Sequence, residues 1–215
     1  MGYDAGSLVA AIRELGAVIA QRRTELTHLD QEIGDGDHGE NLARGFSAVL
    51  TKLQAAEPET PAKVMSLVAS TLISTVGGAS GPLFGTAFLR ASTVFGSATE
   101  FDGNLVAAAL SAARDGVIAR GKAEMGDKTM VDALSPAADA AIEAAAQGAD
   151  VAAVTAAAAA AAATGAESTK SLQARKGRAS YLGERSIGHV DPGAQSTAYL
   201  LASLAASAAA RTGHK

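Results

Sequence analysis

The chain has 215 residues, of which 48% are apolar and only 4% aromatic, and it carries a formal charge of −4 and no cysteine. A chain of this length lies near the upper end for one compact domain, so we expect a single domain over residues 1–215. The lack of cysteine excludes a disulfide scaffold, a thiolate zinc site and a cysteine nucleophile, and the lack of a basic run argues against nucleic acid as a partner.

The predicted secondary structure is almost entirely helical. Alanine, the strongest helix former, is abundant, and runs of alternating β-branched residues are nearly absent. Apolar residues recur at helical spacing from Leu8 to Ile19 and predict a first helix over about residues 7–25. A polar, glycine-rich segment follows it and ends at Gly39, and apolar residues over 42–53 mark the second helix.

Capping residues predict where the later helices begin, which makes about eight amphipathic, antiparallel helices in all. These starts are, in chain order, Thr60 with Pro61, Pro82, Asp102, Thr129 and, for the last helix, Asp191 with Pro192. The third helix should end near Val76 and the fifth near Gly121, and Gly148 should separate the sixth from an alanine-rich seventh. Residues 174–190, which carry four basic side chains, are predicted to form a long functional loop.

Two stretches bear on where the protein is found. Residues 1–7 lack both the positive region and the apolar region of a signal peptide. The most apolar stretch, residues 151–163, is mostly alanine and is shorter than the roughly 20 residues that a membrane span needs. We therefore expect a packed helix at 151–163 and a cytoplasmic protein with no membrane partner.

The segment richest in chemistry, residues 29–41, combines three aspartates with three glycines. Asp30, Asp35 and Asp37 would repel one another unless a cation lies among them, and both Mg²⁺ and Ca²⁺ take oxygen ligands. A calcium EF-hand is excluded because position twelve counted from Asp35 is Phe46 rather than a glutamate. Mg²⁺ usually completes its shell with water and substrate phosphate. The segment therefore predicts a magnesium and phosphate site, against the alternative of a solvated acidic turn.

The second helix begins directly after these aspartates. Backbone N–H groups at a helix start attract anions, so phosphate oxygens are expected near His38, Gly39, Glu40 and Asn41. A neutral imidazole at His38 would be able to hydrogen-bond such a phosphate.

Three further segments each permit a functional and a purely structural interpretation. Residues 77–81, Gly-Gly-Ala-Ser-Gly, are typical of a phosphate-cradling loop but also of a plain turn, and no Walker A lysine follows them. Arg178, in the basic loop, is suited to stabilise charge on a transferring phosphoryl group or simply to be solvated. Residues 121–134 break the chain before a capped helix, where Met130 either packs in the core or lines a flat apolar pocket.

Taken together, four motifs resemble those of the nucleotide-binding L subunits of dihydroxyacetone kinase. They are residues 33–39, Ile-Gly-Asp-Gly-Asp-His-Gly; residues 77–82, Gly-Gly-Ala-Ser-Gly-Pro; residues 126–132, Gly-Asp-Lys-Thr-Met-Val-Asp; and residues 174–179, Ala-Arg-Lys-Gly-Arg-Ala, followed by 188–194, Gly-His-Val-Asp-Pro-Gly-Ala. Their order and their spread over nearly the whole chain make the resemblance specific.

That resemblance implies a barrel of eight antiparallel amphipathic helices with the nucleotide at one end. Asp30, Asp35 and Asp37 would bind two Mg²⁺ ions that bridge the phosphates, and with Arg178 they would be the catalytic residues. The bound nucleotide would be ADP, or ATP as its phosphorylated form. Its contacts would come from His38, Gly39, Glu40, Asn41, Ala79, Ser80, Gly121, Met130, Arg178, Asp191, Pro192 and Gly193.

In this family the phosphoryl group passes from the nucleotide on L to dihydroxyacetone bound on a separate K subunit. In one branch ADP stays bound and a phosphohistidine M subunit recharges it. The resemblance therefore implies a phosphotransferase subunit that works in a heteromeric complex or as a homodimer. Two alternatives stay open, namely an L subunit that exchanges ATP and serves another ketose, and a nucleotide-binding regulatory module that contacts a transcription regulator.

Overall fold

The computed structural model of the chain describes residues 2–212, which form eight α-helices, two 3₁₀ segments and one pair of two-residue strands. The α-helices are α1 (Ala5–Ile33), α2 (His38–Ala56), α3 (Pro61–Thr75), α4 (Ser80–Phe95), α5 (Gly103–Gly121), α6 (Met130–Ala146), α7 (Val151–Ser168) and α8 (Pro192–Thr212). The strands β1 (Tyr3–Asp4) and β2 (Glu100–Phe101) pair antiparallel, and the 3₁₀ segments η1 (Thr169–Ser171) and η2 (Arg178–Ser186) lie between α7 and α8. The prediction of an almost all-α chain with about eight helices is confirmed.

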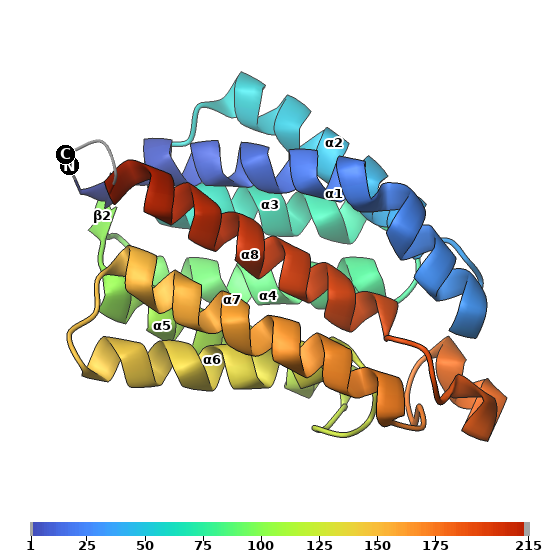
Figure 1. Cartoon of the computed structure of the whole chain (residues 1–215). Helices are drawn as coiled ribbons and strands as arrows, with labels where there is room; N and C mark the ends of the chain where they lie inside the picture. The colour runs from blue at the N-terminus through green and yellow to red at the C-terminus, as the bar shows by residue number, and fades with distance from the viewer. Residues whose placement is uncertain (1, 213–215) are drawn as a thin grey trace.

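The helices form a closed ring in chain order. Each helix packs against the next one along the chain, and α8 returns to pack against α1, so that α1 and α8 run side by side in Figure 1. Most connections between neighbours are short, which makes consecutive helices antiparallel. The expected barrel of eight antiparallel helices is therefore the observed arrangement.

This alternation sorts the connections between the two ends of the barrel. Those after α1, α3, α5 and α7 lie at one end, and those after α2, α4 and α6 lie at the other, together with the start of α1 and the end of α8 (Figure 1). All four sequence motifs lie in or beside the first set of connections. The up-and-down ring thus gathers distant parts of the sequence at one end.

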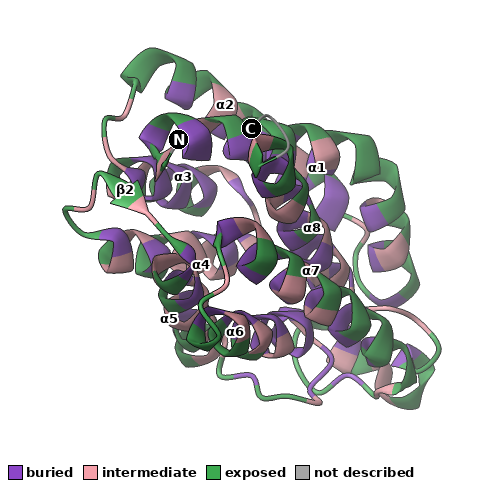
Figure 2. Cartoon of the chain, turned by 60° about the vertical axis from the view of Figure 1, so that its left-hand side comes forward, coloured by how far each residue is buried: buried purple, intermediate pink, exposed green. Residues whose placement is uncertain are grey.

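Apolar side chains fill the inside of the ring, and Figure 2 shows buried residues on the inner helix faces and exposed residues on the outer ones. Ile12, Leu15 and Phe46 are among the fully buried side chains of the larger cluster. An apolar cavity of about 150 Å³ lies beside this cluster. Phe84 and Met130 line this cavity and also line the pocket at the end that carries the motifs.

Alanine builds the other part of the core. α6, α7 and α8 meet through buried alanines rather than large side chains, among them Ala137, Ala158 and Ala198. Gly165 of α7 lies so close to α6 that a Cβ placed on it would be 2.2 Å from the carbonyl oxygen of Asp132. Small residues therefore let these helices approach closely, and many weak van der Waals contacts stabilise the contact.

The boundaries beside the α1–α2 connection differ from the sequence prediction. α1 continues to Ile33, further than predicted, because Leu26, Asp30 and Ile33 repeat at helical spacing and are all buried. Asp30 is therefore in the last turn of a helix and not in a loop. α2 begins at His38, so the predicted polar segment shortens to residues 34–37.

Four of the predicted helix starts are confirmed by capping hydrogen bonds. Side-chain oxygens accept backbone N–H bonds at 2.7 to 3.3 Å in the first turns of α3, α5, α6 and α8, and they belong to Thr60, Asp102, Thr129 and Asp191. α4 begins at Ser80, slightly ahead of the predicted Pro82. The predicted loop over 174–190 is partly ordered into the 3₁₀ turns of η2, which the sequence did not indicate.

Among residues 2–212, one helical stretch, Val151–Ser171, is long and apolar enough to cross a membrane by length and composition alone. It covers α7 and η1, and α7 packs between α6 and α8. Core helices of globular proteins pass the same test, and these contacts make α7 a wall of the barrel.

Gly165→Ala should lower the free energy of unfolding by about 1–3 kcal/mol, although alanine is the better helix former, because the added methyl group meets the backbone of α6. Gly6→Ala is the matched control, since Gly6 is also helical but the nearest atom to its new Cβ would be 3.5 Å away. Stability should rise there by up to about 1 kcal/mol. Urea denaturation followed by circular dichroism measures both variants, and equal effects would contradict the close contact.

Candidate functional site

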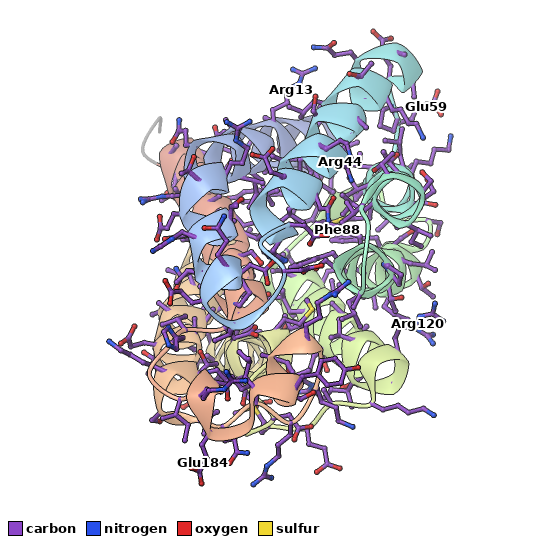
Figure 3. The ribbon with its side chains drawn as sticks, turned by 90° about the vertical axis from the view of Figure 1, so that its right-hand side faces the viewer. Arg13, Arg44, Glu59, Phe88, Arg120 and Glu184 are labelled. Carbon is purple, nitrogen blue, oxygen red and sulfur yellow. The ribbon has the colours of Figure 1, made fainter. Side chains whose placement is uncertain are left out.

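A pocket of about 550 Å³ opens at the end of the barrel where the four motifs meet. The α1–α2 connection, the starts of α4 and α6, the end of α5 and the α7–α8 segment surround it. Figure 3 views the molecule from this side and labels Arg120, at the end of α5, and Glu184, in η2; of these two residues, Arg120 lines the pocket. The residues singled out from the sequence that line the pocket are Asp30, Asp35, Asp37, His38, Ala79, Ser80, Gly121, Met130, Arg178, Asp191, Pro192 and Gly193.

Three carboxylates cluster on the α1–α2 side of the pocket. One oxygen each from Asp30, Asp35 and Asp37 lies within 4.8 Å of the other two, a spacing that suits divalent cations. Asp30 is buried, and its Oδ2 accepts the backbone N–H groups of Asp37 at 2.9 Å and of His38 at 3.1 Å. These two bonds hold the Asp30 carboxylate in place and fold the 34–37 connection over the end of α1.

The basic loop reaches this cluster through one ion pair. Nε of Arg178 lies 3.0 Å from Oδ2 of Asp35, and both side chains are partly exposed. Exposed ion pairs contribute less than about 1 kcal/mol, so this contact is easily exchanged for another partner. Arg178 is therefore held near the carboxylates without being locked there.

His38 is a buried link between three helices. Its Nδ1 lies 3.1 Å from Oγ of Ser80 at the start of α4, and its Nε2 lies 3.0 Å from Oγ of Ser196 in α8. Burial lowers the pKa of the ring, against the opposing charges of Asp30 and Asp37, and so favours the neutral form. A neutral imidazole has one donor nitrogen and one acceptor nitrogen, so the two serines must play opposite roles in these bonds.

A buried lysine and a carboxyl of raised pKa lie on the α7–α8 side. Lys128 is 1% exposed, and its Nζ donates to the carbonyl oxygen of Thr169 at 2.6 Å and to that of His189. Burial lowers the pKa of this amine, while the charge of Asp191 opposes the shift. Burial likewise raises the pKa of the Asp191 carboxyl to about 7, against the effects of the Ala194 N–H and of Lys128. Lys128 thus ties the α7–α8 segment to the start of α6.

A second part of the pocket lining is apolar. It is formed by Leu83, Phe84, Val117, Ala123 and Met130. Side chains of this kind bind a planar ring or another apolar group, whereas the carboxylates bind cations. The pocket therefore suits a ligand that has one apolar end and one end able to share a divalent cation.

Gly39, Glu40 and Asn41 do not line the pocket among the residues described. Gly39 packs on α1, where a Cβ would be 2.1 Å from the carbonyl oxygen of Arg23, and Glu40 pairs with Arg23 at 3.3 Å. Asn41 is buried beside the glycine loop and accepts a hydrogen bond from Arg44 at 2.5 Å. Their expected ligand contacts stay predictions, and the structure gives each of them a packing role.

Several pocket residues carried no prediction. Arg120, Lys128 and Lys176 line the pocket, yet nothing local in the sequence signals that Lys128 is buried or that Arg120 stands at the rim. Ser196, which does not line the pocket, also carried no prediction, although its Oγ contacts His38, a residue 158 positions away. Only the closure of α8 against the rest of the ring creates that contact.

Comparison with known proteins identifies related chains. The sequence profile of the DAK2 domain matches residues 32–206. The chain is 43% identical over 208 residues to the PEP-dependent dihydroxyacetone kinase, ADP-binding subunit DhaL, of Escherichia coli. This alignment covers 97% of the present chain and 99% of the Escherichia coli protein. It is 40% identical over 209 residues to the PEP-dependent dihydroxyacetone kinase 1, ADP-binding subunit DhaL, of Listeria innocua, with 93% and 95% covered.

The fold is also similar to that of a solved dihydroxyacetone kinase. The dihydroxyacetone kinase from C. freundii in complex with AMP-PNP and Mg²⁺ superposes with a TM-score of 0.73 at 27% sequence identity. The match covers 96% of this chain and 35% of that one, so the present chain corresponds to one part of the larger kinase.

Asp191→Asn should change how stability depends on pH. Because folding raises the pKa of Asp191 from 3.8 to about 7, the folded protein keeps a proton that the unfolded chain loses. This group therefore stabilises the fold fully below about pH 4, and the contribution is lost as the pH rises through about 7. The loss is about 4 kcal/mol at most, since each pKa unit is worth roughly 1.4 kcal/mol.

The asparagine stays neutral and keeps an oxygen for the N–H of Ala194, which Asp191 binds at 2.7 Å. The variant should match the wild type in stability near about pH 4 and exceed it near about pH 8. Urea denaturation of metal-free and nucleotide-free protein across this range measures the difference. A difference that stays constant with pH would contradict the effect of burial on this carboxyl.

Proposed function

Since this chain belongs to the DAK2-domain family, as an ADP-binding L subunit of dihydroxyacetone kinase, we propose that it holds magnesium and nucleotide in the barrel-end pocket and transfers a phosphoryl group to dihydroxyacetone on a separate K subunit. A phosphohistidine M subunit then recharges the bound ADP to ATP. One observation carries the proposal: three carboxylates, the glycine loop and Arg178 surround one pocket in a chain that matches ADP-binding subunits over nearly its full length.

The donor set of the pocket fits magnesium. Asp30, Asp35 and Asp37 offer carboxylate oxygens, which Mg²⁺ prefers over softer ligands. Mg²⁺ is usually bound by one or two carboxylates and takes its other ligands from water and phosphate, so three carboxylates suffice for two ions, and we propose two. When bound, such ions neutralise charge on the β- and γ-phosphates and align them for transfer.

The remaining nucleotide contacts come from helix starts and from the apolar lining. The first turns of α2 and α4 lie beside the carboxylates, and backbone N–H groups at such positions attract phosphate. Ala79 and Ser80 would contact the phosphates from the start of α4. Gly121 and Met130 would border the adenine ring, and residues 191–193 would close the ribose or adenine side.

Arg178 provides positive charge beside the transferred group. Its ion pair with Asp35 is exposed and weak, so a cation that takes Asp35 as a ligand leaves the guanidinium free to turn to the phosphates. An arginine in that position stabilises the charge that spreads over the phosphoryl oxygens during transfer. The same guanidinium that pairs with Asp35 would thus act on the transferring phosphoryl group.

The complex would work in the cytoplasm, with the K and M subunits as partners and with no membrane or nucleic-acid partner. The nucleotide released when the purified protein is denatured distinguishes the branches of the family. Stoichiometric ADP that resists exchange supports recharging by M, whereas free exchange supports direct use of ATP, for dihydroxyacetone or another ketose. Transfer that is absent with both K and M supplied would favour a regulatory module instead.

Asp35→Ala should abolish tight nucleotide retention, with an affinity for Mg-ADP reduced on the order of 10²-fold, because one carboxylate of the metal cluster is lost. Asp115→Ala is the matched control, since Asp115 is exposed and pairs with Arg114 outside the pocket. Calorimetry and the nucleotide content of the purified proteins measure the effect. Full occupancy in the Asp35 variant would contradict the metal site.

Arg178→Ala should lower the rate of phosphoryl transfer on the order of 10²-fold while changing Mg-ADP affinity much less, because its charge acts on the transferring group. Arg185→Ala is the control, since Arg185 lies in the same 3₁₀ segment but does not line the pocket. Transfer is measured with K and M subunits supplied. Equal losses for both variants would indicate a general effect of loop charge rather than a role of Arg178.

A further inference from the structure

The hydrogen bonds of His38 connect the pocket to a serine that does not line it. Ser196 is fully buried in α8, and its Oγ lies 3.0 Å from Nε2 of His38. On the other side of the imidazole, Nδ1 lies 3.1 Å from Oγ of Ser80, which lines the pocket at the start of α4. Side chains from α8, α2 and α4 thus form one line of hydrogen bonds that ends at the pocket.

The imidazole couples the directions of the two bonds. If Nε2 carries the proton, it donates to Ser196, and Ser80 must donate its own hydrogen to Nδ1. Ser80 then presents only lone pairs to the pocket, and these repel a phosphate oxygen. If Nδ1 carries the proton instead, it donates to Oγ of Ser80, Ser196 donates to Nε2, and the Ser80 hydrogen is free to reach an anion.

The surroundings of Ser196 favour the second arrangement. The geometry also allows the Ser196 hydroxyl to donate to the carbonyl oxygen of Gly193 at 3.0 Å, the same distance as to Nε2 of His38. That oxygen already accepts from the hydroxyl of Thr197 at 2.8 Å, and in the first turn of α8 its regular partner is a backbone N–H four residues later. With these two donors on its two lone pairs, that oxygen is the poorer acceptor for Ser196, and Nε2 of His38 is the better one.

We propose that Ser196 is a positioning residue for phosphoryl transfer: it donates to Nε2 of His38, sets the tautomer with the proton on Nδ1, and so leaves the Ser80 hydroxyl free to donate to a nucleotide phosphate. The inference rests on the proposed nucleotide site, because Ser196 acts only if Ser80 meets a phosphate there. Ser196 itself does not line the pocket and works through the imidazole alone.

The first test is spectroscopic and uses the wild-type chain with Mg-ADP. Long-range ¹H–¹⁵N correlation of the imidazole nitrogens distinguishes the two neutral tautomers, and a His38→Gln variant assigns the signal. The proton should be found on Nδ1. A proton on Nε2 would overturn the proposal, and this experiment does not depend on any serine variant folding.

The second test measures Mg-ADP affinity by calorimetry. Ser196→Ala should weaken binding on the order of 10-fold, the usual size of an effect transmitted through a supporting hydrogen bond. Ser196→Thr, which keeps the hydroxyl, should restore affinity. Ser203→Ala is the matched control, because it removes another buried hydroxyl from α8, about two helical turns beyond Ser196 and outside the pocket lining, and it should leave affinity unchanged.

A double variant tests whether Ser196 acts through Ser80. Ser80→Ala alone should weaken Mg-ADP binding, and adding Ser196→Ala should cause no further loss, because the hydroxyl that Ser196 orients is gone. Additive losses would overturn the relay, as would a Ser196→Ala variant that binds like the wild type or a Ser203→Ala variant that is equally impaired. A wild type that fails to bind Mg-ADP at all would instead overturn the proposed function.

Discussion

The alternating direction of eight helices in a closed ring is the constraint on which the site depends. Because neighbours are antiparallel, every second connection falls at the same end, and the four connections after α1, α3, α5 and α7 surround one pocket. None of these segments contains all the groups that line the pocket. The carboxylates lie in the last turn of α1 and in the connection after it, the glycine loop precedes α4, the apolar lining comes from α4 to α6, and the basic loop precedes α8.

Buried polar groups then fix the positions of those connections relative to one another. Asp30 accepts two backbone N–H groups, His38 joins two serines, and Lys128 donates to two carbonyl oxygens. Each group would be costly to bury without such partners. Since the partners belong to different helices and connections, the same bonds that satisfy these groups fix where the helix ends lie relative to one another, and the pocket is pre-organised before a ligand enters.

Large and small side chains pack different parts of the barrel. Large aliphatic side chains such as Ile12 and Leu15 fill the part of the core around α1, whereas α6, α7 and α8 approach each other through alanine and Gly165. Close approach of α8 matters for the site, because it carries both Ser196 and the Asp191 cap to the pocket end. The packing of α8 against α6 and α7 therefore also fixes where Ser196 meets His38.

The sequence by itself determined the helical class, most helix starts, the aspartate trio and the family, because caps, periodicity and motifs depend on neighbours along the chain. Only the tertiary structure decided that Asp30 belongs to a helix whose polar end is buried, that Glu40 faces away toward Arg23, and that Lys128 is enclosed. It alone decided that Ser196 meets His38. Burial and contact between distant residues follow from how eight helices pack together, and no local window of sequence contains that information.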